Sequence, residues 1–102
     1  MGRFVKVAVV GDVPPGSAKL VEVEDKQIAL FNLGGAFYAI DNACTHAGAS
    51  LAEGTIEENH VICPWHGANF DLQSGQALTP PAPEGVAVYK VRVQDSDVEI
   101  EL

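Results

Sequence analysis

Two short segments, Cys44–Gly48 and Cys63–Gly67, hold the residues with the most evident chemistry. Each brings one thiol and one imidazole close together, and in each a glycine follows within two residues of the histidine. The chain has only two cysteines, and both stand in these segments. Soft thiolate and imidazole ligands that arrive as two Cys/His pairs predict a metal site.

The spacing within each pair helps to distinguish a two-iron cluster from a site for a single metal ion. A single residue lies between Cys44 and His46, and two lie between Cys63 and His66. One intervening residue is tight for chelating a single ion, whereas two irons side by side let the thiolate and the imidazole reach different metals. A [2Fe–2S] cluster offers four terminal positions, which two cysteines and two histidines fill if both histidines bind the same iron. The alternative is a mononuclear Cys₂His₂ zinc site, although zinc ligands are usually spaced by about two to four residues.

The two segments resemble the motif of the Rieske family of iron–sulfur proteins, C-x-H and further along C-x-x-H. The resemblance covers essentially the whole chain. It implies one [2Fe–2S] cluster, with Cys44 and Cys63 on one iron and His46 and His66 on the other. It also implies a set of residues that surround and tune the cluster: Thr45, Gly48, Trp65, Gly67, Ala68, Phe70 and Pro81.

The neighbours of the second segment bear on the reduction potential. Rieske potentials span roughly −150 to +300 mV, against about −400 mV for plant-type ferredoxins. High-potential members of the family carry serine and tyrosine hydroxyls where this chain has Ala68 and Phe70, which can donate no hydrogen bond. Without those donors the more negative reduced cluster is less stabilised. We therefore predict a potential below about −50 mV, towards the low end of the Rieske range.

The elements that must position these segments are short strands. Apolar and β-branched runs, several of them alternating, are separated by glycine, proline, asparagine and aspartate. Gly34-Gly35 predicts a tight hairpin turn, since both positions tolerate positive φ. No run of ten or more residues keeps a helical period, so little helix is expected. The expected strands are 4–10, 19–24, 27–33, 36–40, 55–57, 61–63, 69–72, 76–78, 86–93 and 97–102.

The pattern indicates an all-β fold, a small antiparallel β-sandwich or barrel. By resemblance this is the Rieske fold, a single domain over residues 1–102 with an inserted cluster-binding subdomain at about 42–84. Pro80–Pro83, which follows the ligand segments, is expected to form a stiff lid that keeps water off the cluster, with a rigid connector as the alternative.

The charge balance limits the partners. Fourteen acidic and six basic residues give a net charge of −8, which disfavours nucleic acid and anionic membranes. It suits a protein partner with a basic docking patch, or simply a solubilising surface. No stretch approaches the roughly 18 apolar residues of a membrane span, and Lys6 interrupts the apolar N-terminal run. We expect a monomer in the cytoplasm, with no membrane contact.

The resemblance implies a one-electron carrier, the ferredoxin component of a bacterial aromatic-ring dioxygenase system. Its partners would be a flavin reductase and the terminal oxygenase, and the chain itself would catalyse no bond-making. The small Rieske-like subunit of an assimilatory nitrite reductase is the nearest alternative. A Rieske oxygenase would need a two-histidine, one-carboxylate iron site as well, but no histidine follows residue 72. A zinc-stabilised binding module is the remaining alternative.

Overall fold

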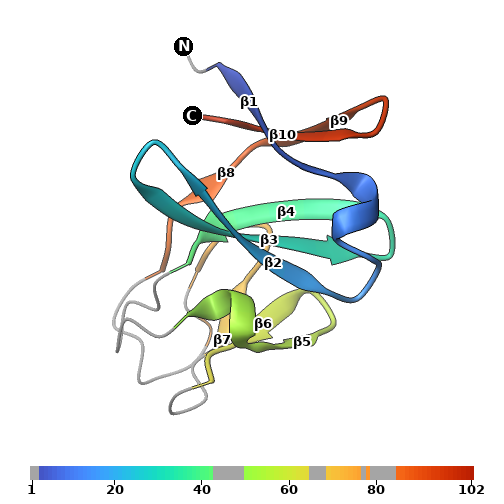
Figure 1. Cartoon of the computed structure of the whole chain (residues 1–102). Coiled ribbons are helices and arrows are strands. Elements are labelled where there is room, and N and C mark those ends of the chain that lie inside the picture. Colours follow the sequence, from blue (N-terminus) through green and yellow to red (C-terminus); the bar gives the residue numbers. More distant parts are fainter. Residues whose placement is uncertain (1–2, 43–49, 65–68, 77, 79–84) are drawn as a thin grey trace.

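A computed structural model describes residues 3–42, 50–64, 69–76, 78 and 85–102. These residues form ten strands and two short 3-10 helices (Figure 1). The strands are β1 (Phe4–Val9), β2 (Ala18–Val23), β3 (Lys26–Leu33), β4 (Ala36–Asp41), β5 (Thr55–Glu57), β6 (His60–Ile62), β7 (Asn69–Asp71), β8 (Val88–Tyr89), β9 (Val91–Gln94) and β10 (Asp97–Glu101). The helices are η1 (Val10–Asp12) and η2 (Leu51–Glu53). The expectation of an all-β chain with little helix is confirmed.

The described strands make three sheets, and every pairing between them is antiparallel. Their orders are β1-β10-β9, β2-β3-β4-β8 and β5-β6-β7. In Figure 1 the four-stranded sheet lies between the other two, with β5–β7 and η2 on one side and the sheet of both termini on the other. Only Lys90 separates β8 from β9. The chain therefore passes directly from the middle sheet (β2-β3-β4-β8) to the terminal sheet (β1-β10-β9).

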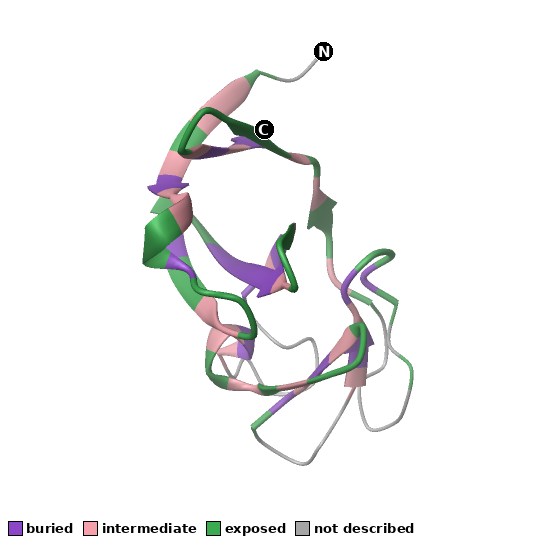
Figure 2. Ribbon diagram, turned by 90° about the vertical axis from the view of Figure 1, so that its right-hand side faces the viewer, coloured by how far each residue is buried: buried purple, intermediate pink, exposed green. Residues whose placement is uncertain are grey.

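The middle sheet is buried on both faces, and β3 shows why. Successive residues of a strand point to opposite faces. Ile28 and Leu30 belong to the buried cluster shared with the terminal sheet, whereas Ala29 and Phe31 belong to the cluster shared with β5–β7. All four side chains are fully buried, which explains the unbroken apolar run in this strand. Figure 2 shows the buried residues along the strands, and the exposed ones mainly at turns.

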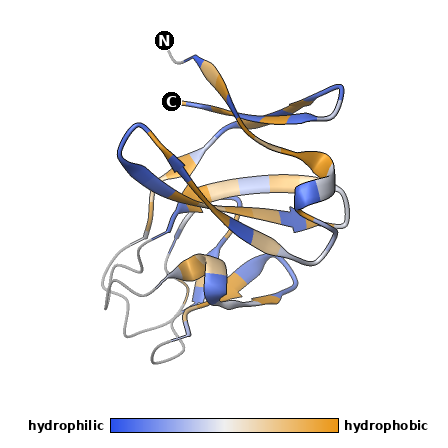
Figure 3. Cartoon of the chain, in the orientation of Figure 1, coloured by the Kyte–Doolittle hydropathy of each residue, from blue (hydrophilic) through white to orange (hydrophobic). Residues whose placement is uncertain are grey.

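Outer strands follow the alternation that the sequence predicts. In β2, Val21 is buried, while its neighbour Leu20 is 41% exposed. Hydrophobic and hydrophilic residues alternate along this strand in Figure 3. The Gly34-Gly35 turn is also confirmed, with φ angles of 63° and 102° between the paired residues Leu33 and Ala36.

Of the expected strands, only 55–57 has the bounds that the structure gives; six others shift by one residue at one or both ends, and the remaining three differ for an identifiable reason. The strand expected at 61–63 is His60–Ile62, because Glu57 pairs with His60 across a two-residue turn. The strand expected over 86–93 is two strands, because the chain changes sheets at Lys90. Residues 76 and 78 are not in a strand, although the amides of Asp71 and Leu78 donate to the carbonyls of Gln76 and Asn69, at 3.0 and 2.7 Å.

Candidate metal centre

Cys63 directly follows β6, at the border between core and surface. Its side chain is 2% exposed and packs in the apolar cluster that holds Val61, Phe70 and Leu72, while the next residue, Pro64, is exposed. The other expected ligands, Cys44, His46 and His66, lie outside the described residues, as do Thr45, Gly48, Trp65, Gly67, Ala68 and Pro81. Of the expected cluster environment, the structure describes Phe70, which is fully buried in β7.

Asn42 joins the two ends of the segment that carries Cys44 and His46. Its carbonyl oxygen accepts from the amide of Leu51 at 2.8 Å, and its side-chain Oδ1 accepts from the amide of Ala52 at 2.9 Å. Its Nδ2 donates to the Ser50 hydroxyl at 3.0 Å. The described residues on either side of this segment, Asn42 and Ser50–Ala52, are therefore in direct contact.

The segment that carries His66 is closed by strand pairing. It begins after Ile62 and ends before Asn69, and these two residues pair across β6 and β7. Gly54, just after η2, packs directly on β6, because a Cβ added there would lie 2.3 Å from the Ile62 carbonyl oxygen. This close approach fixes the base of the second segment against the base of the first.

Gly75 and Gly85 bring together the two ends, or base, of the segment that contains the prolines. The Val86 amide donates to the Gly75 carbonyl at 2.7 Å. A Cβ on Gly75 would lie 2.1 Å from the Val86 carbonyl oxygen, and one on Gly85 would lie 2.3 Å from the Gly75 oxygen. Gly75 also has a φ of +75°, which favours glycine. The turn after β7 and the approach to β8 are therefore held in direct backbone contact.

Asp41 connects the base of the first segment to the strand that follows the prolines. Its amide donates to the Ala87 carbonyl at 2.9 Å, and its carboxylate accepts from the Tyr89 hydroxyl at 2.6 Å. Burial raises the pKa of Tyr89 to about 12, and the hydrogen bond to Asp41 and the negative charge of Asp41 add to the rise. The bases of all three segments are thus linked to one another, and Cys63 is buried among them. This arrangement places Cys63, a thiol suited to an iron–sulfur cluster, close to the bases of the segments that carry the other expected ligands.

Charge is unevenly divided along the chain. Residues 27–89, which include all the ligand candidates, contain six carboxylates and no lysine or arginine. The remaining residues hold eight carboxylates and all six basic residues. Four of those basic residues form ion pairs with carboxylates of the same part: Arg3–Glu24, Lys6–Asp97, Lys19–Asp12 and Arg92–Glu99. The part that would carry the cluster is therefore the part with uncompensated negative charge.

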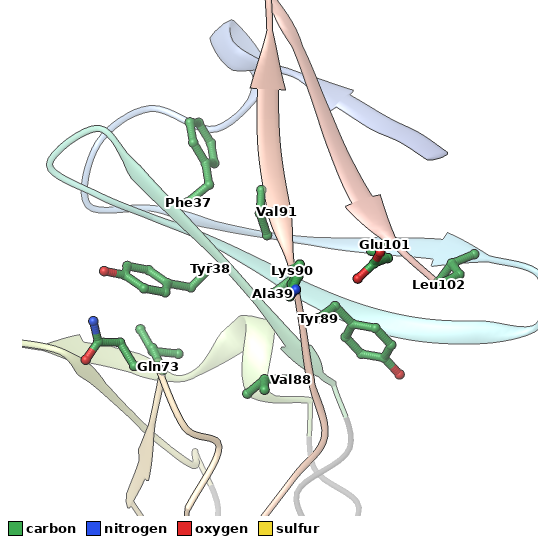
Figure 4. A pocket seen from close by; sticks show the side chains of 11 residues that line it. Phe37, Tyr38, Ala39, Gln73, Val88, Tyr89, Lys90, Val91, Glu101 and Leu102 are labelled. Carbon is green, nitrogen blue, oxygen red and sulfur yellow. The ribbon is translucent and has the colours of Figure 1, made fainter. Parts of the chain in front are cut away.

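A hollow of about 680 Å³ lies between β4 and the β8–β9 segment (Figure 4). Phe37, Tyr38, Val88 and Tyr89 line it, together with Lys90 and Glu101 near the C-terminus. Among the described residues that line it there is no cysteine or histidine. The described part of the chain thus has an open groove, but its lining offers no metal ligand of the kind that the two Cys/His pairs supply.

Comparisons with known proteins identify the family of the chain. A family model, the Rieske [2Fe-2S] domain, matches residues 3–90. The 3-phenylpropionate/cinnamic acid dioxygenase ferredoxin subunit of Shigella boydii serotype 4 (strain Sb227) is 45% identical over 94 residues, covering 91% of this chain and 88% of that protein. The chain belongs to the Rieske [2Fe–2S] family.

Solved structures extend the likeness to the fold. The ferredoxin of carbazole 1,9a-dioxygenase from Nocardioides aromaticivorans IC177 superposes with a TM-score of 0.91, at 28% identity over 95% of both chains. A chain in a complex of reduced oxygenase and oxidized ferredoxin of carbazole 1,9a-dioxygenase gives 0.88, at 33% identity over 95% of this chain and 91% of that one. Chains described as nitrite reductase small subunits also match, but below 25% identity, which shows the fold alone.

These findings confirm several expectations. The fold is the Rieske fold, and the cofactor is one [2Fe–2S] cluster. The chain is a Rieske ferredoxin of the kind found in aromatic-ring dioxygenase systems, an electron-transfer component and not the catalyst. Within the described residues, the helices are too short to cross a membrane.

The sequence reasoning missed the residues that close the three segments. Asn42 and Ser50 flank the first ligand segment in the sequence, so a pair of hydrogen-bonding side chains on either side of it was a usable signal. Gly75 and Gly85 similarly flank the prolines. The link between Asp41 and Tyr89 spans 48 residues and has no local signature.

Proposed function

We propose that this chain carries single electrons from a flavin reductase to the terminal oxygenase of an aromatic-ring dioxygenase system. The observation that carries the proposal is the likeness, over most of both chains, to a dioxygenase ferredoxin subunit. The bound cluster supplies a site that accepts and releases one electron. Cys44 and Cys63 would hold one iron, and His46 and His66 the other.

The described residues support this assignment through what they do around the ligands. The apolar cluster around Cys63 keeps water from its sulfur, which lowers the local dielectric and helps to set the potential. Phe70 fills the adjacent space without offering a hydrogen-bond donor. The linked bases fix the described residues on either side of each ligand segment. Thr45, Gly48, Trp65, Gly67 and Ala68 would complete the surroundings of the cluster, and Pro81 would lie in its cover.

The charge division supports a partner with a basic surface. The uncompensated carboxylates lie in the same part of the chain as the ligand candidates, so the field of the protein would steer that part towards positive charge. The terminal oxygenase and the reductase would each offer such a patch near its own redox centre. We propose a monomer that meets them one at a time in the cytoplasm, where thiol ligands stay reduced before the metal is loaded.

Electron transfer between purified components tests the proposal. The protein should be red-brown, contain iron and acid-labile sulfide in equal amounts, and give the low average g value of imidazole-bound iron after reduction. With a flavin reductase present, it should restore turnover of a ring-hydroxylating oxygenase that is inactive without it. A colourless zinc protein would overturn the cluster assignment. Delivery of electrons to a nitrite reductase, and to no oxygenase tested, would support the nitrite reductase alternative instead.

A further inference from the structure

Asn42 is one of two asparagines that are buried in the described part of the chain. It is 4% exposed, yet both its backbone groups and both its side-chain groups are hydrogen-bonded. Its amide donates to the Gln27 carbonyl in β3 at 3.0 Å, which fixes it to the middle sheet. Its carbonyl and its side chain bond to Ser50, Leu51 and Ala52, on the far side of the first ligand segment.

We propose that Asn42 is a positioning residue that presents Cys44 and His46 to the cluster by clamping both ends of the segment that carries them. This inference rests on the proposed ligand assignment. Closing a loop costs conformational entropy, and ordering each residue within it costs more. Because Asn42 closes the loop through bonds that involve no metal, that part of the cost is met before the cluster binds. Loss of the clamp therefore speeds release of the cluster.

The clamp depends on the side chain of Asn42 as well as on its backbone. The Ala52 amide and the Ser50 hydroxyl both meet the side-chain amide of Asn42, at 2.9 and 3.0 Å. An alanine at position 42 keeps the two backbone hydrogen bonds. It removes the side-chain groups that now bond to the Ala52 amide and the Ser50 hydroxyl. Both partners are half-buried, and polar groups that lose their partners in such a site are costly, so the chain at Ser50 loosens locally.

Asn32 provides a matched control. It is 2% exposed and makes the same kinds of bonds: its backbone groups pair with Ser17 and Gly16, its Nδ2 donates to the Val13 carbonyl at 2.7 Å, and its Oδ1 accepts from the Gly35 amide at 2.8 Å. Its partners lie in the loop before β2 and the turn after β3, away from both ligand segments. Asn32→Ala thus removes an equivalent buried amide without touching the first ligand segment.

The test measures how fast the loaded protein loses its visible cluster absorbance in excess iron chelator, for wild type, Asn42→Ala, Asn32→Ala and Ser50→Ala. A lost buried hydrogen bond corresponds to about a tenfold change in an equilibrium constant, so Asn42→Ala should lose its cluster about tenfold faster. Ser50→Ala should fall between it and wild type, and Asn32→Ala should stay within about twofold of wild type. The Ser50 hydroxyl also lies 3.1 Å from Oδ1 of Asn42 and can donate to it. Asn42→Asp therefore keeps an acceptor for both the Ala52 amide and the Ser50 hydroxyl, and should restore most of the retention.

The outcomes are distinguishable. The electron resonance linewidth of Asn42→Ala should broaden, because the ligand segment then samples more than one geometry, while Asn32→Ala keeps the wild-type line. Equal cluster loss in the two alanine variants would mean that only global stability matters and would overturn the proposal. If Asn42→Ala does not fold, Ser50→Ala decides alone: a wild-type rate overturns the clamp. A wild-type protein without the imidazole-type signal would instead refute the ligand assignment itself.

Discussion

The hydroxyl of Tyr89 lies 2.6 Å from a carboxylate oxygen of Asp41, a residue 48 positions earlier in the chain. Asp41 ends β4, and the first ligand segment begins soon after it. Tyr89 lies in β8, the first strand after the prolines. One side-chain hydrogen bond therefore connects the entrance of the ligand segment to the exit of the proline segment, alongside the backbone bond between Asp41 and Ala87.

Removing the Tyr89 hydroxyl should lower stability and change its dependence on pH. Tyr89→Phe is expected to lose about 1 kcal/mol in the free energy of unfolding at pH 8. The pKa of Tyr89 is raised to about 12, whereas an unfolded tyrosine titrates near 10. The stabilisation is therefore fully present below pH 10 and is lost as the pH rises from about 10 to 12.

Denaturant unfolding at pH 8 and pH 11 measures this difference. Wild type should lose up to about 1 kcal/mol more than Tyr89→Phe over that interval, since solvent screens part of the effect at this half-buried site. Tyr38→Phe serves as the control, because it removes a hydroxyl from the neighbouring strand β4. Identical pH dependence in wild type and Tyr89→Phe would show that the bond does not link ionisation to folding.

The ligand assignment predicts a sharp difference between histidines. His46→Ala and His66→Ala should give protein without the imidazole-type cluster signal, and Cys63→Ala should contain no iron. His60, the first residue of β6, is the control, and His60→Asn should keep full iron content and colour. Iron analysis and electron resonance of the purified variants check this. Loss of the cluster in His60→Asn, with retention in His66→Ala, would mean that the wrong histidine was assigned.

A hydroxyl placed beside the cluster should raise the potential. Phe70 shares an apolar core with Cys63, so the hydroxyl added by Phe70→Tyr would lie in the core region that holds this expected ligand. A hydrogen bond of about 1.4 kcal/mol to the reduced form corresponds to about 60 mV for a one-electron couple. Film voltammetry should show this rise from a wild-type value below about −50 mV. Phe37→Tyr adds a hydroxyl in the other apolar cluster and should leave the potential unchanged.

Partner docking should depend on where a carboxylate lies and not only on net charge. Glu53 ends η2, which follows the first ligand segment, whereas Asp95 lies in the turn between β9 and β10 (Figure 1). Both are exposed, and Glu53→Gln and Asp95→Asn each remove one negative charge. At low ionic strength Glu53→Gln should slow electron delivery to the oxygenase about twofold to threefold, and Asp95→Asn should change it little. Stopped-flow kinetics that show equal slowing would favour a diffuse charge effect.

Much of the fold followed from local rules. Alternation placed Val21 inside and Leu20 outside, and two adjacent glycines defined the β3–β4 turn. The bounds of β6, β8 and β9 were missed, because they depend on where a strand meets its partner and where the chain changes sheets. Such events are set by distant residues, and no short window of sequence contains them.

The sequence by itself determined the chemistry. The types and spacing of two thiols and two imidazoles restrict which metals can bind, because ligand softness is a property of the side chain alone. Only the tertiary structure decided how the ligand segments are held. It brought Asn42 to Ser50, Gly75 to Val86 and Tyr89 to Asp41. Asn42 and Ser50 at least flank one segment of the sequence, but Tyr89 and Asp41 are 48 residues apart and become neighbours only when distant strands pair, so the order of residues does not reveal that contact.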